Sequence, residues 1–121
     1  MTERVRSTAA QAAGDRGEER AARFLAHHGL QIVARNYRTR QGKIDLIAFE
    51  GAVLVFVEVR MRSAARFGDG AESVDFSKKR RLIAAARHYL LTLGREPACR
   101  FDVVSLEHDA PTWIRAAFET N

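Results

Sequence analysis

The spacing of apolar residues along the chain predicts two helices. Apolar positions recur every three or four residues over residues 15–28 and again over about 75–93, which is the pattern of a helix with one buried face. Asp15 is a suitable N-cap for the first helix, and Gly29 is a suitable stop after it. Gly94 and Pro97 end the second helix in the same way.

Five further segments are rich in β-branched and aromatic residues and predict strands: residues 30–37, 43–49, 53–59, 100–106 and 113–118. Gln41-Gly42 and Glu50-Gly51 predict tight turns, and residues 62–73 predict a loop. The resulting order, α-β-β-β-α-β-β, predicts an α/β fold with a mixed sheet of about five strands flanked by helices. We expect residues 1–13 to be a frayed segment or a short helix, and residues 14–121 to form a single domain.

The composition is that of one folded domain. The chain has 121 residues, of which 46% are hydrophobic and 29% charged, so it can bury a core and is not disordered. Its single cysteine excludes a disulfide scaffold. The longest apolar run covers six residues, 52–57, and the amino terminus carries no hydrophobic signal core. We therefore expect a cytoplasmic protein without a membrane partner.

The net positive charge of the chain and its uneven distribution indicate which class of molecule the protein binds. Lys and Arg together number 20 against 15 Asp and Glu, a formal net charge of +5, and 17 of the 20 are arginine. Residues 60–100 hold ten of the basic residues and only four of the acidic ones. A one-sided basic surface is typical of proteins that bind nucleic acid, so a nucleic acid is one expected partner. The alternative is a structural protein whose basic face only keeps it soluble.

Charged side chains interrupt two apolar strands at the same level of the predicted hairpin. A two-residue turn at Glu50-Gly51 places Lys43 opposite Glu58 and Asp45 diagonal to it, with Arg60 nearby. Both faces of these strands are otherwise apolar, so the carboxylates are expected to be buried and to need compensation. Two alternatives remain open: a cluster of salt bridges with the two cations, or a divalent metal held by the carboxylate oxygens.

A third carboxylate can reach this cluster from the first helix. Glu18 precedes Ala21 by three residues and Leu25 by seven, so it shares the apolar stripe of that helix. The alternative role for Glu18 is local, because Asp15 and Glu18 also have the spacing of a capping box.

Four segments of the chain together resemble a known family. They are Gly14-Asp-Arg-Gly17-Glu18, Gly42-Lys-Ile-Asp45-Leu-Ile-Ala48, Val55-Phe-Val-Glu58-Val-Arg60 and Val74-x3-Lys78-x2-Arg81. In type, order and spacing they resemble the YraN-like family of small predicted endonucleases, and the resemblance covers residues 14–104. That family is placed in the restriction-endonuclease-like PD-(D/E)xK superfamily and is similar to archaeal Holliday junction resolvases.

The resemblance implies a restriction-endonuclease-like core and metal-dependent hydrolysis of DNA phosphodiester bonds, with branched DNA as one substrate. It implies that Asp45 and Glu58 bind Mg²⁺ or Mn²⁺ and that Glu18 completes the acidic site. Arg60 stands where the family motif has its catalytic lysine, and an arginine keeps its charge but cannot act as a base. We hypothesise that Lys43, which replaces the usual glutamate of the family, supplies the missing amine. The alternative is a catalytically inactive module that binds nucleic acid or protein.

A basic run opens the second predicted helix, although the positive end of the helix dipole disfavours cations there. This run and two arginines of the preceding loop are the candidate nucleic-acid-binding residues: Lys78, Lys79, Arg80, Arg81, Arg62 and Arg66. The alternative is a solvated charge run. No sequence-reading motif is present, so we expect recognition of DNA backbone and shape, with a homodimer suited to cutting both strands. Asp102, which lies within an apolar strand, is expected to pair with an arginine of this helix.

Overall fold

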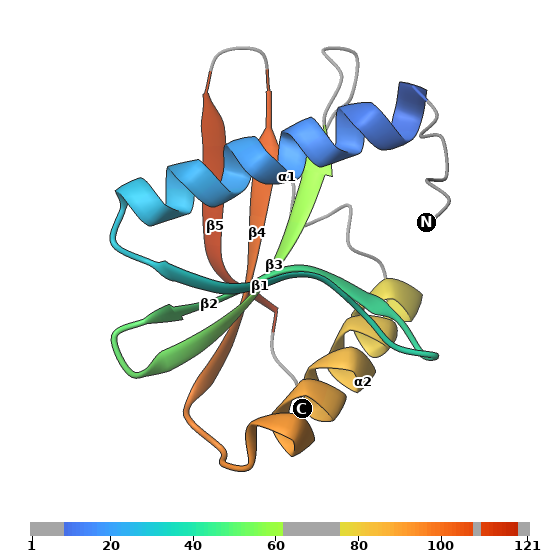
Figure 1. Ribbon diagram of the computed structural model, residues 1–121, viewed down its shortest axis with the longest axis vertical. Helices are drawn as coiled ribbons and strands as arrows, with labels where there is room; N and C mark the ends of the chain where they lie inside the picture. Colours follow the sequence, from blue (N-terminus) through green and yellow to red (C-terminus); the bar gives the residue numbers. More distant parts are fainter. Residues whose placement is uncertain (1–8, 62–75, 108–109, 119–121) are drawn as a thin grey trace, which may run out of the picture.

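The computed structural model describes residues 9–61, 76–107 and 110–118, and its helices and strands follow the predicted order (Figure 1). The elements are α1 (Ala9–His27), β1 (Gln31–Arg38), β2 (Lys43–Glu50), β3 (Val53–Met61), α2 (Phe76–Leu93), β4 (Cys99–Leu106) and β5 (Pro111–Phe118). Within this part of the chain, neither helix is long and apolar enough to cross a lipid bilayer. The predicted loop over residues 62–73 lies outside the described residues.

The five strands form one mixed sheet in the order β1-β2-β3-β4-β5. β3 and β4 are parallel, whereas the other three neighbouring pairs are antiparallel. The parallel pair needs a crossover connection, and α2 lies in that connection. The α/β class, the mixed sheet and the element order of a restriction-endonuclease-like core are therefore confirmed.

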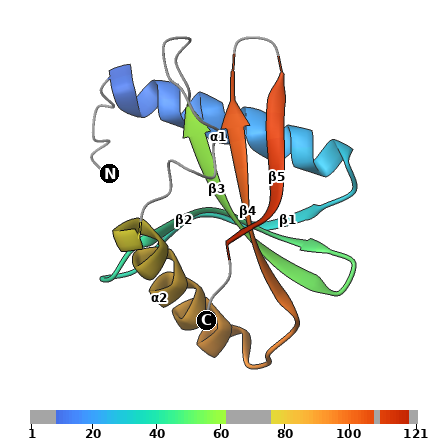
Figure 2. The ribbon, with the colours of Figure 1, turned by 180° about the vertical axis from the view of Figure 1, so that it is seen from behind.

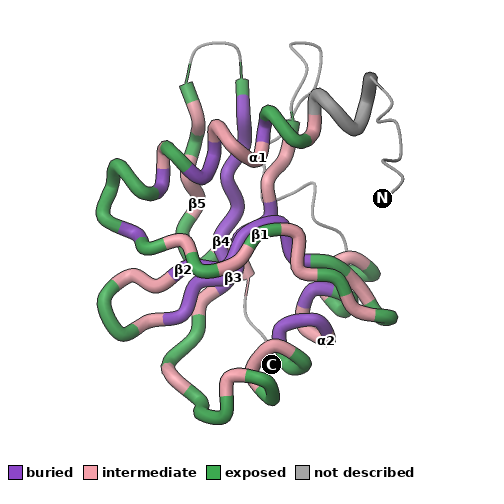
Figure 3. The backbone as a smooth tube through the Cα atoms, viewed as in Figure 1, coloured by how far each residue is buried: buried purple, intermediate pink, exposed green. Residues whose placement is uncertain are grey.

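The two helices cover opposite faces of the sheet, as Figures 1 and 2 show from the two sides. On one face, Leu25 of α1 packs in a buried cluster with Leu46 and Val57. On the other face, Leu82 of α2 belongs to a second cluster with Phe56. The central strands are consequently buried along most of their length, which Figure 3 displays for β3 and β4. The carboxylates of Asp45, Glu58 and Asp102, which lie on these strands, are accordingly buried.

Helix α1 begins earlier than predicted. It starts at Ala9, so Asp15 lies inside the helix and the prediction of Asp15 as its N-cap is wrong. The capping-box role for Glu18 is wrong for the same reason. Alanine favours helix, and the alanine-rich segment 9–13 forms the beginning of α1. Residues 1–8 lie outside the described part of the chain.

The turn between β2 and β3 is displaced by one residue from its predicted position. Glu50 pairs with Val53, so the turn residues are Gly51 and Ala52. Gly51 adopts a φ of 60°, the left-handed conformation that a tight hairpin turn requires and that glycine adopts without strain. The resulting register pairs Leu46 with Val57. The predicted placement of Lys43 opposite Glu58 is therefore wrong.

The regular alternation of β2 breaks at Asp45. Ile44 and Ile47 both pack in the cluster under α2, although residues three apart on a regular strand face opposite sides. The paired strand β1 is also irregular here, because Asn36 has a φ of 52°. The described pairing of β2 with β3 starts at Leu46 and runs toward the turn. Asp45 thus stands where β2 leaves β3.

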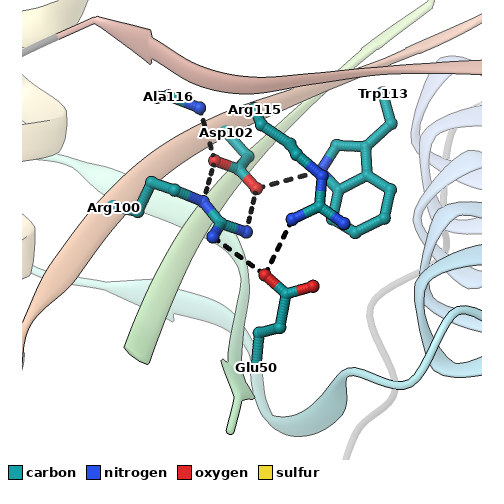
Figure 4. A network of polar contacts seen from close by, with 6 residues as sticks. All are labelled: Glu50, Arg100, Asp102, Trp113, Arg115 and Ala116. Carbon is teal, nitrogen blue, oxygen red and sulfur yellow. Dashed lines mark hydrogen bonds and ion pairs between the residues drawn. The ribbon is translucent and has the colours of Figure 1, made fainter. Parts of the chain in front are cut away.

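A buried polar network holds β5 against β4 (Figure 4). Asp102 is 1% exposed, and its two carboxylate oxygens accept hydrogen bonds from Arg100, Trp113 Nε1 and the Ala116 backbone, each at 2.9 Å. Arg100 lies on the same strand as Asp102, so the predicted pairing with an arginine of α2 is wrong. Glu50 joins the network through Arg100. Donors from both strands converge on Asp102, which makes the network a structural clamp.

We predict that Asp102→Ala lowers the free energy of unfolding by about 3 kcal/mol, because it leaves the partly buried Arg100 guanidinium without its main partner. Urea unfolding followed by circular dichroism measures the change. The matched control is Glu50→Gln, which removes the more exposed carboxylate and is expected to cost less than about 1 kcal/mol. Equal destabilisation by the two variants would contradict a clamp centred on Asp102.

Candidate functional site

Asp45 bridges the two strands at the point where they separate. Its Oδ2 accepts a hydrogen bond of 2.8 Å from the backbone N–H of Val59, and its Oδ1 accepts one of 2.7 Å from Lys43 Nζ. The carboxylate therefore takes the place of a carbonyl that would otherwise satisfy the Val59 N–H in a continued sheet. The separation of the two strands therefore opens the sheet at this point and leaves the Asp45 carboxylate inside the opening.

Glu58 lies on β3 beside Asp45, with only 6% of its side chain exposed. Lys78 Nζ of α2 lies 2.6 Å from Glu58 Oε2, and Arg60 Nη1 lies 3.6 Å from the same oxygen. Lys43 makes its close contact with Asp45 instead, which corrects the predicted Lys43–Glu58 pair. The cation nearest to Glu58 thus comes from α2, where sequence reasoning placed only phosphate contacts.

Glu18 enters the same cluster from α1, as its position on the apolar stripe indicated. Its Oε1 accepts a hydrogen bond of 3.1 Å from Asn36 Nδ2, and its Oε2 lies 3.9 Å from Lys43 Nζ. At the preceding residue, Gly17, α1 lies close to the end of β3, since a Cβ built there would lie 2.7 Å from Met61 Sδ. A close contact between helix and strand therefore carries the third carboxylate to the site.

Burial and the charge of Asp45 raise the pKa values of the two neighbouring glutamates. Burial, followed by the negative charge of Asp45, raises the pKa of Glu18 from 4.5 to about 7, against the opposing effect of Lys43. Burial and Asp45 also raise the pKa of Glu58, although Lys78 opposes the shift. Burial alone would lower the pKa of Lys43, but its hydrogen bond to Asp45 and the nearby acids raise it on balance. Lys43 therefore remains an ammonium ion at neutral pH.

The cluster lines a small cavity of about 220 Å³ that contains the candidate catalytic residues of all three elements. Its carboxylate oxygens are hard donors of the type that Mg²⁺ and Mn²⁺ prefer. Among the described residues, however, no group of three or more His, Cys, Asp and Glu side chains is arranged to hold a metal ion. The donor chemistry fits a divalent cation, while the present positions of the ammonium groups favour the salt-bridge alternative.

The four cations of the basic run of α2 do not all lie at the same place. Lys78 and Arg81 line a larger cavity of about 510 Å³ next to the acidic one. Lys79 instead lies over the Phe118 ring of β5, with its Nζ 5.4 Å from the ring centroid. Arg80 lies over the ring of Phe76, 5.7 Å from its centroid, and borders a third cavity. The two loop arginines, Arg62 and Arg66, lie outside the described residues.

Sequence reasoning missed two cations of the β1–β2 turn. Arg38 and Arg40 line the 510 Å³ cavity together with Lys43. Their signal in the sequence was their position on either side of Thr39, directly before the Gln41-Gly42 turn and the Asp45 motif. These positions indicate a role for the two arginines only when the turn is known to lie against α2.

Comparison with known proteins identifies the family. A model described as "Uncharacterised protein family UPF0102" matches residues 17–106, most of the chain and all of its candidate acidic residues. The chain belongs to the uncharacterised protein family UPF0102. A UPF0102 protein of Nitrosospira multiformis is 52% identical over 111 residues, covering 89% of this chain and 93% of that protein. A UPF0102 protein of Cupriavidus taiwanensis is 51% identical over 113 residues, covering 92% and 86%. The expected family is confirmed, whereas placement in the endonuclease superfamily stays a prediction.

We predict that the stability of this UPF0102 protein falls as the pH rises from 4.5 to about 7 and that Glu18 causes part of the decrease. A carboxyl whose pKa is raised on folding favours the folded state below its unfolded pKa, and that advantage disappears as the group ionises. Burial is the main cause of the raised pKa of Glu18, Asp45 and Asp15 add to it, and Lys43 opposes it. In metal-free buffer, Glu18→Gln should therefore unfold with a weaker pH dependence.

Urea unfolding at several pH values between 5 and 8 measures this difference. After allowance for solvent screening, we expect the Glu18→Gln variant to gain about 1–2 kcal/mol relative to the unsubstituted protein between the two ends of this range. Glu19→Gln, one residue along α1 and more exposed, is the matched control. Parallel pH profiles for the unsubstituted protein and Glu18→Gln would show that folding does not raise the pKa of Glu18.

Proposed function

We propose that this chain is a metal-dependent endonuclease that hydrolyses phosphodiester bonds of DNA. The observation that carries the proposal is the convergence of Asp45, Glu58 and Glu18 in one cavity, at the point where two strands separate. Buried acids with raised pKa values are costly to keep in a core, and such groups concentrate at functional sites. The cavity adjoins a basic groove, which supplies the charge that a DNA backbone needs.

The metal of this proposal is Mg²⁺ or Mn²⁺, held by Asp45 and Glu58 with Glu18 completing the set. When bound, such an ion polarises a phosphoryl oxygen and lowers the pKa of an attacking water. Lys43 and Lys78 now occupy carboxylate oxygens, and both are partly exposed on flexible stems. Their ammonium groups can therefore swing toward solvent or toward a phosphate when a divalent ion replaces them.

The cations around the carboxylates stabilise the negative charge of the phosphate during the reaction. Arg60 stands at the position of the motif lysine and, as a permanent cation, stabilises negative charge on the phosphate without accepting a proton. Lys43 supplies the amine that position 60 lacks, from the side of Asp45 instead of the side of Glu58. Its protonated state makes it a donor to phosphate oxygens and excludes a role as general base.

A second candidate function is a non-catalytic module that binds nucleic acid or protein on the same fold. The observation in its favour is the charge balance of the acidic cavity, since the three carboxylates already face Lys43, Arg60 and Lys78. Paired in this way, the acids need no metal. Metal binding and cleavage therefore separate the two functions.

We propose DNA as the partner of this protein and the cytoplasm as its location. DNA is recognised through its backbone and shape, and a branched substrate agrees with the resemblance to junction resolvases. A homodimer would place two such sites for the two strands of a junction. A cytoplasmic location agrees with a chain that has a single cysteine.

The test of catalysis is cleavage of labelled branched, flapped and linear DNA in Mn²⁺. We expect cleavage by the unsubstituted protein and a decrease of at least about a hundredfold in Asp45→Asn and Glu58→Gln, because several kcal/mol of charge stabilisation disappear. Glu19→Gln, which alters an exposed carboxylate of α1, is the control and should cleave normally. Calorimetric titration with Mn²⁺ provides a second readout, with heat in the unsubstituted protein and none in Asp45→Asn. DNA binding without cleavage or metal heat would favour the non-catalytic module.

The role of Lys43 has its own test. We predict that Lys43→Met lowers the cleavage rate by at least about tenfold, since one donor to the developing charge is worth a few kcal/mol. Lys43→Arg should retain more activity than Lys43→Met, and adding Arg60→Lys to Lys43→Met should restore part of the activity by returning an amine to the motif position. The measurement is the single-turnover cleavage rate at saturating protein. An unchanged rate in Lys43→Met would exclude this role.

A further inference from the structure

The acidic cavity is the end of a longer depression in the surface. Lys43, Glu58 and Lys78 line both the 220 Å³ acidic cavity and the neighbouring 510 Å³ cavity. Gln41 and Arg81 line both that cavity and a third one of about 340 Å³. The three cavities therefore adjoin in sequence, and we refer to the second and third together as the turn–helix groove.

The walls of the turn–helix groove are the β1–β2 turn and the first turns of α2, which lie side by side in Figures 1 and 2. Thr39 Oγ1 accepts hydrogen bonds from the backbone N–H groups of Gln41 and Gly42, at 3.1 and 3.0 Å. Thr39 N–H in turn donates to the Gly42 carbonyl at 2.7 Å. These hydrogen bonds fix the conformation of the turn, and none of them involves a charged side chain.

Gly42 holds this turn against the helix. A Cβ at this position would lie 2.6 Å from the carbonyl oxygen of Arg81 and 2.9 Å from its Cβ. Backbone atoms of a helix cannot yield as a side chain can, so only glycine permits the approach. The groove is consequently preformed, which lowers the entropy that a ligand must lose on binding.

The charge of the groove is strongly positive. The described residues lining the 510 Å³ cavity include five cations and one carboxylate, Glu58, which is already paired with Lys78. In the described part of the chain, no carboxylate forms an ion pair with Arg38, Arg40 or Arg81. Arginine forks match the paired oxygens of a phosphate group. The lining of this cavity has no aromatic side chain among the described residues, so it offers no surface for stacking bases.

We propose that the turn–helix groove binds the sugar-phosphate backbone of one DNA strand, with Arg38, at the end of β1, and Arg40, in the β1–β2 turn, as its phosphate-binding residues. The strand passes Arg81 and the turn, and its next phosphate reaches Lys43, Lys78 and the acidic cavity. This inference deepens the proposed function and rests on it for the identity of the polymer. It assigns to the turn a substrate-positioning role that the basic run of α2 cannot fill alone, because Lys79 lies against Phe118.

The test is binding of a fluorescent single-stranded and a fluorescent duplex oligonucleotide, measured by anisotropy in EDTA so that no cleavage occurs. Arg38→Ala/Arg40→Ala should weaken binding at least about tenfold. For each phosphate that the variant no longer neutralises, the salt slope should fall by about 0.7 on the single strand or about 0.9 on the duplex. The matched control is Arg87→Ala/Arg95→Ala, which removes two exposed arginines that do not line the groove. It should weaken binding by no more than about threefold, the effect of net charge alone.

A second variant tests the groove without changing its charge. Gly42→Ala forces the turn away from α2, so we expect weaker binding with all cations retained. Thermal unfolding of each variant checks that the fold is intact under the assay conditions. Equal binding by the groove variant and its control, or by Gly42→Ala and the unsubstituted protein, would overturn the proposal, and so would the absence of DNA binding at low salt.

Failure of this inference can be told apart from failure of the proposed function. If binding depends on Arg38 and Arg40 but neither Mn²⁺ heat nor cleavage is found, the groove stands and the nuclease does not. If cleavage depends on Asp45 while Arg38→Ala/Arg40→Ala binds like its control, the nuclease stands and the groove is wrong.

Discussion

The separation of β2 from β3 beyond Leu46 is the constraint on which the rest of the site depends. A continued sheet would satisfy the Val59 N–H with a backbone carbonyl, but here the carboxylate of Asp45 accepts that bond. An acid is thereby fixed at the mouth of the opening, with one oxygen bound to the main chain and the other available to a cation. Because the strands separate only at their ends, the hydrophobic core on both faces remains continuous beneath the site.

The two buried acidic clusters of the protein differ in how well they are satisfied. Asp102 accepts hydrogen bonds from a guanidinium, an indole and a backbone amide, so the fold compensates its charge fully. Glu58 and Glu18 share their cavity with Asp45, and burial together with the charge of Asp45 raises their pKa values in spite of the nearby cations. One cluster therefore stabilises the fold, while the other retains unfavourable electrostatic energy of the kind that an added cation can relieve.

The same geometry connects the acids to the basic groove. Lys43 and Lys78 belong to both, since each contacts a carboxylate and also lines the larger cavity. Under the proposed function, two cations that can turn from a carboxylate to a phosphate would couple metal binding to substrate binding. The replacement of the motif lysine by Arg60 is then less disruptive than the motif alone suggests, because amines reach the acids from β2 and α2 instead of from β3.

Local pattern in the sequence was enough for the element order, the mixed α/β class, the buried faces and the acids that converge, because helical and strand periodicity depend on near neighbours. The convergence of Glu18 with Asp45 and Glu58 also followed from its place on an apolar stripe. Only the tertiary structure decided the pairing of charges. A turn displaced by one residue to Gly51 and Ala52 moved Lys43 away from Glu58, and packing of α2 against the sheet brought Lys78 there. Neither is encoded locally, since register depends on the φ that a turn accepts, and ion pairs between distant elements depend on how helices and sheet pack.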